Sequence, residues 1–246
     1  MSIGRIGSSP YRATYALIAI NVVVYVVMLL AGPLDEDGSF TRERLIQFGG
    51  IYPPLVRAGE WWRLLSAAFV HASAPHLIWN MLSFAFLGRW LEPRYAQLRY
   101  LALYLLGALG SSFATLAWYW NTDLVAIGAS GAICALIGAG AASAFRMGIR
   151  GTEFRNSMLA WAAVVLINGV TNHANNVAHA SGLILGALLV LAFGRRGAAA
   201  LRPREQAADA LGGEDVVTCS ACGAGNPPVS AYCGRCGAAL RKAAIG

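Results

Sequence analysis

Charged residues are scarce in this sequence. Only 13% of its 246 residues are Asp, Glu, Lys or Arg, whereas 57% are hydrophobic. A soluble domain normally carries about a quarter charged residues. The composition therefore excludes an ordinary soluble fold and predicts an all-α membrane protein whose main solvent is lipid.

Cysteine is also scarce over most of the chain. Cys134 is the only cysteine before residue 219, and the other four lie close together near the C-terminus. This distribution excludes a scattered extracellular disulfide framework and favours a reduced compartment for the tail.

Long apolar runs are what the sequence does contain. Crossing a bilayer takes about 20 apolar residues in a helix, and the sequence predicts six such helices, the fifth of them short for a span. The first continues too long for a signal peptide and has no small-residue cleavage site after it, so we expect a retained anchor. The six predicted segments are Tyr11–Ala31, His76–Leu91, Leu98–Trp118, Ile127–Phe145, Met158–Thr171 and Val177–Phe193.

The arginines predict the orientation of these segments. With six spans, the arginine-rich loops all fall on one side of the membrane, and basic loops mark the cytoplasmic side. We therefore expect both termini in the cytoplasm, in the plasma membrane of a prokaryote. The opposite side holds a long loop in which Leu55–Val70, with Trp61 and Trp62, is expected to lie in or on the outer leaflet.

Three of the predicted helices begin on the outer side and carry chemically capable side chains in their first turns. These are His76 and Asn80 on the second helix, Ser130 on the fourth and His179 on the sixth. A serine hydroxyl becomes a good nucleophile when a neighbouring base takes its proton, and His179 can act as that base. No acidic residue lies near the start of the sixth helix, so we expect a catalytic dyad whose imidazole is oriented by packing or stacking.

The same layer offers donors for a developing oxyanion. His76 and Asn80 are four residues apart and share one face of a helix, and the backbone N–H of Ser130 is a third donor. Small residues, Gly128 and Gly131 among them, keep the fourth helix thin enough to be surrounded by others.

Simpler interpretations of these residues also exist. A serine in a Gly/Ala-rich span is usually a packing residue, and the run GASGA lacks the final glycine of a nucleophile elbow because Ala132 stands there. A histidine in a membrane helix also suits a transporter or a proton relay. His71 is expected to support a loop or the rim of a cavity, and His173 to be an exposed loop residue.

Taken together, the motifs resemble the rhomboid family of intramembrane proteases over roughly Tyr11–Phe193. The resemblance implies a six-helix bundle that cleaves transmembrane segments of membrane proteins near the outer face. It also implies roles for individual residues, since in that family the matching Ser and His form the dyad, the matching His and Asn line the oxyanion hole, and the matching Gly sits beside the serine. The sequence departs from some members at Cys134, where they carry an aromatic that stacks on the catalytic histidine. The motifs are Trp62–Arg63, His71, HLIWN (76–80), GASGA (128–132) and AHASG (178–182) with Gly186.

The C-terminal tail contains a second motif. Two CxxC pairs, Cys219/Cys222 and Cys233/Cys236, are separated by ten residues, and this spacing predicts a tetrahedral four-thiolate zinc site. The tail resembles the zinc-ribbon modules appended to many prokaryotic proteins. Two roles remain open for the tail: a small structural module that the metal stabilises, or a site that docks a cytoplasmic protein partner. Its basic residues are too sparse to predict nucleic-acid binding.

The predicted organisation is thus a membrane domain over 1–194, a cytoplasmic linker over 195–216 and a zinc-ribbon module over 217–241. Structural Zn²⁺ is expected in the ribbon and no cofactor is expected for catalysis. The predicted partners are the lipid bilayer and transmembrane protein substrates. Two alternatives remain: a non-catalytic rhomboid-like protein that escorts membrane clients, and a small transporter.

Overall fold

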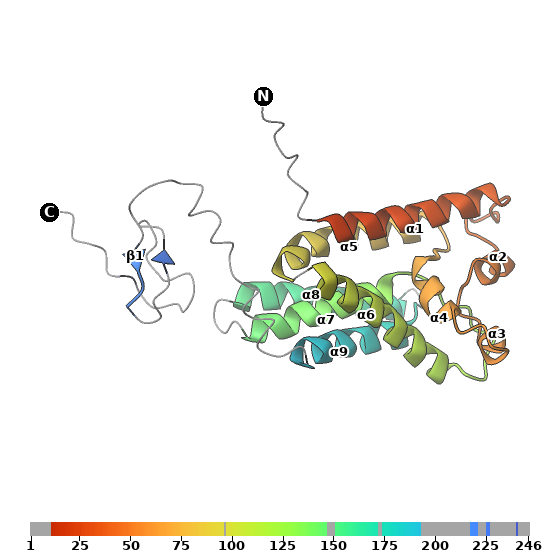
Figure 1. The fold of residues 1–246 in the computed structure, drawn as a ribbon. Coiled ribbons are helices and arrows are strands. Elements are labelled where there is room, and N and C mark those ends of the chain that lie inside the picture. The colour runs from red at the N-terminus through yellow and green to blue at the C-terminus, as the bar shows by residue number, and fades with distance from the viewer. Residues whose placement is uncertain are drawn as a thin grey trace, which may run out of the picture. The chain divides into compact units, whose positions relative to one another are not determined.

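A computed structural model describes residues 11–95, 97–146, 151–171, 174–192, 217–220, 225–226 and 240. By contacts, the chain divides into two units, Met1–Gly194 and Arg195–Gly246. Figure 1 shows the first unit as a set of long helices with shorter helices at one end. The long helices are α1 (Arg12–Leu30), α5 (Ala74–Leu91), α6 (Gln97–Trp118), α7 (Ser130–Arg146), α8 (Thr152–Thr171) and α9 (Asn176–Ala192).

Each of the six predicted segments overlaps one of these helices, and two of the helices begin three or more residues from the predicted start. The fourth starts at Ser130, because Gly128 has a positive φ of 108° that a helix does not accommodate. The fifth starts at Thr152, so α8 has 20 residues. Its polar first turns, from Thr152 to Ser157, lie outside the predicted span because they interrupt the apolar run without interrupting the helix.

Within the described ranges, two helices, α1 and α6, are long and apolar enough to cross a membrane by length and composition. The helices α7 and α9 are apolar but have 17 residues each. Six membrane spans therefore stay a prediction, whereas the helical character of all six segments is observed.

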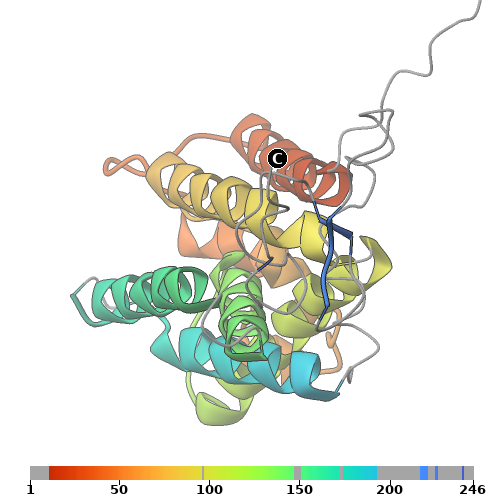
Figure 2. The ribbon, with the colours of Figure 1, turned by 90° about the vertical axis from the view of Figure 1, so that its left-hand side faces the viewer.

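Helix α7 forms the centre of the unit. It contacts α5, α6, α8 and α9, and Figure 2 shows it among them. Every residue from 131 to 140 on α7 is buried. Helix α9 approaches α7 closely because glycines face backbone: a Cβ at Gly182 would collide with the carbonyl oxygen of Gly131, and one at Gly186 with that of Ala135. Small residues thus bring two backbones together at the level of Ser130.

The N-terminus of α1 is anchored by a buried carboxylate. Glu92, in the 3-10 helix η2 (Glu92–Arg94), is 4% exposed. It accepts hydrogen bonds from the backbone N–H groups of Ala13 (2.8 Å) and Thr14 (2.9 Å) and from the Thr14 hydroxyl (2.6 Å). The Thr14 hydroxyl also lies 2.9 Å from that of Tyr100. A negative charge at a helix N-terminus satisfies free N–H groups and complements the helix dipole.

Short helices fill the connection between α1 and α5: α2 (Arg42–Gln47), α3 (Pro53–Arg57), α4 (Arg63–Ser66) and the 3-10 helix η1 (Ala67–Phe69). Arg63, only 4% exposed, links several parts of this connection. Its side chain donates to the carbonyl oxygens of Ile46 and Gly50 and forms a 2.6 Å ion pair with Glu60. Trp61 and Trp62 are half exposed, which fits the expected interfacial position of this segment.

The second unit contains a two-residue antiparallel pair of strands, β1 (Val217–Thr218) and β2 (Gly225–Asn226). Cys219 directly follows β1 and is buried. The predicted ligands Cys222, Cys233 and Cys236 lie outside the described residues, and so do His173 and the predicted linker. The zinc site therefore stays a prediction.

Candidate active site

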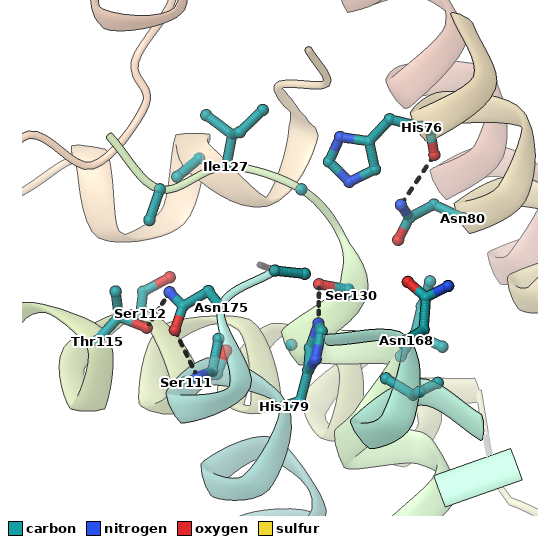
Figure 3. Close-up of a pocket in the computed structure, with 18 of the residues that line it drawn as sticks. His76, Asn80, Ser111, Ser112, Thr115, Ile127, Ser130, Asn168, Asn175 and His179 are labelled. Carbon is teal, nitrogen blue, oxygen red and sulfur yellow. Dashed lines mark hydrogen bonds between the residues drawn. The ribbon is translucent and has the colours of Figure 1, made fainter. Parts of the chain in front are cut away.

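Ser130 and His179 meet across the contact between α7 and α9. Ser130 is the first residue of α7, and His179 lies in the first turn of α9, which Asn175 caps by accepting a hydrogen bond from the N–H of Ala178 (3.1 Å). The Oγ of Ser130 is 3.0 Å from Nε2 of His179, although 49 residues separate them in the chain. His179 is 5% exposed. The structure thus brings the two predicted dyad residues into direct hydrogen-bonding contact (Figure 3).

The segment before Ser130 is held by the connection between α1 and α5. Ile51 and Ala126 exchange two backbone hydrogen bonds of 2.9 and 3.0 Å, and the N–H of Gly128 donates to the carbonyl oxygen of Ala67 (2.8 Å). A Cβ at Gly128 would lie 3.0 Å from the Cε1 and Nε2 atoms of His76. Glycine at this position therefore satisfies both the backbone conformation and the close approach of His76.

His76 and Asn80 lie on α5 and face Ser130 from the other side of a cavity (Figure 3). Nδ1 of His76 accepts a long hydrogen bond of 3.5 Å from the N–H of Ala72. The side-chain nitrogen of Asn80 donates to the carbonyl oxygen of His76 (2.9 Å). An amide NH₂ has two hydrogens, so one remains for another acceptor.

The cavity has a volume of about 340 Å³. Its wall includes the four predicted residues just described and also Gly128 and Gly131, the predicted supporting glycines. Sequence reasoning missed further polar groups of this wall, contributed by α6, α8 and the start of α9. These are Ser111, Ser112, Thr115, Asn168 and Asn175.

His71 lies behind His76 rather than on the cavity wall. It is fully buried between η1 and α5, and its ring packs against that of His76 in an edge-to-face arrangement, with centroids 5.0 Å apart. Burial, followed by the charge of His76, lowers the pKa of His71 to about 3. A neutral, buried imidazole at this position is a packing support for His76.

The orientation of His179 differs from the expectation of packing or stacking alone. Nδ1 of His179 lies 3.2 Å from the side-chain oxygen of Asn176, one helical turn earlier. The sequence contains the signal for this contact, an Asn three residues before the His, which is a spacing at which side chains on a helix meet. Sequence reasoning missed it because only a carboxylate was expected in that role.

Comparisons with known proteins identify the family of the chain. The Rhomboid domain profile matches residues 58–196, more than half of the chain. The chain is 29% identical over 205 residues to Rhomboid protease AarA of Providencia stuartii, covering 73% of this chain and 72% of that protein. It is 32% identical over 126 residues to Rhomboid protease GluP of Bacillus subtilis, covering 51% and 23%, and 28% identical over 173 residues to Rhomboid-like protease 2 of Toxoplasma gondii, covering 68% and 60%.

These matches identify the class of protein as a serine-type intramembrane protease, and hence as an integral membrane protein. The chain belongs to the rhomboid family. It spans less than two thirds of the Bacillus and Toxoplasma relatives.

Proposed function

We propose that the chain cleaves peptide bonds in transmembrane segments of other membrane proteins, with Ser130 as the nucleophile and His179 as its base. The observation that carries the proposal is the 3.0 Å contact between Ser130 Oγ and His179 Nε2 at the wall of a cavity. The two atoms are already at the distance that proton transfer requires.

The reaction proceeds through an acyl-enzyme. Nε2 of His179 takes the Ser130 proton as Oγ attacks the substrate carbonyl carbon, and the resulting imidazolium gives that proton to the leaving amine as the C–N bond breaks. Water then loses a proton to His179 and attacks the ester, which releases the carboxylic acid and returns the proton to Ser130. The polar groups of the cavity wall give that water a place to bind.

His76, Asn80 and the backbone N–H of Ser130 stabilise the oxyanion in this proposal. Because Nδ1 of His76 accepts the N–H of Ala72, its proton lies on Nε2. That nitrogen faces the Gly128 position next to Ser130, since a Cβ added there would lie 3.0 Å from it. A donor preorganised beside the nucleophile is what a tetrahedral intermediate requires.

A serine-directed covalent probe tests the nucleophile. We expect it to label purified protein at Ser130, and Ser130→Ala and His179→Ala to abolish labelling. Ser181→Ala is the matched control, because Ser181 on the same helix as His179 donates to the Val177 carbonyl oxygen (2.6 Å) instead of facing Ser130. Labelling that persists in Ser130→Ala would refute the assignment and favour a protein that binds clients without cleaving them.

Cleavage near the outer face rests on the arginine distribution. Ser130, His179 and His76 all lie near the starts of their helices, and the proposed topology of six spans, with both termini in the cytoplasm of a prokaryote, puts those starts outside. A cysteine introduced within Gly32–Phe40 should react with an impermeant thiol reagent on intact cells, and one near Arg150 should not. The reverse pattern would place the site near the cytoplasm.

The tail is proposed to be a separate zinc module. The support is the spacing of Cys219, Cys222, Cys233 and Cys236 in the sequence and the strand pair β1–β2 beside the first of them. Four thiolates close a tetrahedral site and leave no position for catalysis. The module would then serve as a small structural module without a partner or as a docking site for a cytoplasmic protein.

A further inference from the structure

A histidine base must keep one particular nitrogen unprotonated. For Nε2 of His179 to take the Ser130 proton, the resting proton of the neutral ring has to lie on Nδ1. In a serine protease triad a carboxylate enforces this tautomer. Among the described residues, no Asp or Glu hydrogen-bonds His179, so another group must hold its proton on Nδ1.

Asn176 occupies the position of that group. Its side-chain oxygen lies 3.2 Å from Nδ1 of His179. An amide oxygen only accepts hydrogen bonds, whereas the amide nitrogen only donates. If the oxygen faces the ring, Nδ1 must carry the hydrogen, and Nε2 is left free for Ser130.

A contact with α8 decides which end of the amide faces the ring. The side-chain nitrogen of Asn176 donates to the backbone carbonyl oxygen of Leu166 (3.2 Å). A carbonyl cannot donate, so the amide nitrogen must point to α8 and the oxygen to His179. The hydrogen-bond network therefore assigns the tautomer through three successive groups: the Leu166 carbonyl, the Asn176 amide and the His179 ring.

The glycine at position 169 independently shows that α8 is shaped around this amide. Gly169 is buried in the last turn of α8, two residues before the helix ends at Thr171. A Cβ built there would overlap the side-chain oxygen of Asn176. The space that glycine leaves is thus occupied by the atom that contacts His179.

We infer that Asn176 is a positioning residue that holds His179 in the tautomer with its proton on Nδ1, and that Leu166 and Gly169 of α8 hold Asn176 in turn. The inference rests on the proposed role of His179 as the base. It assigns to an amide the task that a carboxylate performs in a triad, and it couples the base on α9 to the position of α8.

Nitrogen NMR of the full chain tests the tautomer directly. The sequence has four histidines, so ¹⁵N-histidine labelling in detergent micelles gives few signals, and His179→Gln identifies the one of interest. We expect a protonated Nδ1 and a bare Nε2 at neutral pH. Asn176→Ala should abolish this preference, whereas Asn175→Ala, which removes the neighbouring cap but not the contact with Nδ1, should keep it. A proton on Nε2 of the unaltered protein, or an unchanged tautomer in Asn176→Ala, would overturn the inference.

Kinetics on a model transmembrane substrate supply the second readout. Asn176→Ala should lower kcat by about 10- to 100-fold, part of what a general base contributes, with little change in KM. Asn176→Asp keeps an acceptor oxygen and should restore the Nδ1–H signal and part of kcat. Gly169→Ala adds one methyl group at the place that the side-chain oxygen of Asn176 occupies, so it should lower kcat by displacing Asn176.

The outcomes separate the inference from the function on which it rests. Unchanged kcat in both Asn176→Ala and Gly169→Ala, with normal probe labelling, would refute the positioning role while leaving the dyad intact. Absence of probe labelling in the unaltered protein would instead refute the dyad. The NMR experiment needs no turnover and still reads the tautomer in that case.

Discussion

Two groups of buried or partly buried polar side chains in the first unit differ in how fully they are paired. In the Glu92 cluster, formed by Glu92, Thr14 and Tyr100, the carboxylate accepts three hydrogen bonds of 2.6–2.9 Å. In the Ser130 cluster, formed by Ser130, His179, His76 and Asn80, the contacts are 2.9–3.5 Å long and the side chains face a cavity of about 340 Å³.

The difference is the one that the proposed catalytic role of the Ser130 cluster requires. A buried charge stabilises a fold only when its partners replace the lost water, and Glu92 meets that condition at the N-terminus of α1. A catalytic group needs spare hydrogen-bonding capacity for charge that appears only in the transition state. We therefore expect substitutions in the Glu92 cluster to change stability and those in the Ser130 cluster to change rate.

Outside the proposed dyad itself, the largest effect should come from Asn80. Asn80→Ala should lower kcat by roughly 10- to 1,000-fold, because it removes one donor from the developing oxyanion, and it should change KM and the unfolding midpoint much less. Turnover of a transmembrane substrate by purified protein measures this. Unchanged turnover in a folded variant would remove Asn80 from the site.

Glu92 should show the opposite pattern. Glu92→Gln replaces one acceptor oxygen by an NH₂ group that opposes backbone N–H donors, and hydrogen bonds to a charged group contribute about 1.5–3 kcal/mol each. We expect the free energy of unfolding in detergent to fall by about 3 kcal/mol, while kcat per folded molecule stays the same. A fall in kcat without a fall in stability would place Glu92 in the catalytic machinery. It would also contradict the proposed difference between a stabilising cluster and a catalytic one.

His71 supports the Ser130 cluster from behind and should produce a smaller, pH-dependent effect. Its pKa is about 3 in the folded protein, against 6.5 for an ordinary exposed imidazole. Between these values the unfolded chain binds the extra proton, so stability rises with pH up to about 6.5 and falls on acidification. At about pH 5.5 this costs about 1.4 kcal/mol relative to pH well above 6.5.

His71→Phe gives the control for that prediction. It keeps an aromatic ring against His76 but has no proton to bind, so the slope of the unfolding free energy between about pH 5 and 6.5 should decrease. An unchanged slope in His71→Phe would assign the acid sensitivity to other groups.

The smallest effect on catalysis should come from the tail. Truncation after about Ala210 should abolish a zinc content of about one ion per chain, because the thiolate ligands are lost, and leave cleavage of a model transmembrane substrate nearly unchanged. Metal analysis and turnover of the same preparation test both halves. If a folded truncated enzyme is inactive, or a chelator stops the full-length enzyme on that substrate, the tail and the site are coupled.

Local pattern was enough to locate the helices and the four chemically capable residues. Apolar runs predicted the six segments, and Ser130, His179, His76 and Asn80 stood out as polar side chains in apolar first turns. The starts of α7 and α8 were predicted less accurately. The start of α7 depends on the backbone conformation of Gly128, and α8 begins with polar turns that the apolar pattern does not include.

Long-range pairing could not be derived from one sequence. Glu92 lies 78 residues from Thr14 in the chain, and no local sequence pattern predicts that its carboxylate caps α1. The amide of Asn176 was overlooked because its role depends on the Leu166 carbonyl and the space at Gly169, which only the packing of α8 against α9 reveals. The departure at Cys134 indicates a missing support for His179 without showing what replaces it.

In the proposed mechanism the base, His179, lies on the last helix of the first unit, and this position has a consequence for biosynthesis. Ser130 leaves the ribosome 49 residues ahead of His179, which at about 5–20 residues per second is an interval of about 2–10 s. During that interval the growing chain carries the proposed nucleophile without its base. In that mechanism proteolytic competence arises only when α9 has been made and has docked against α7.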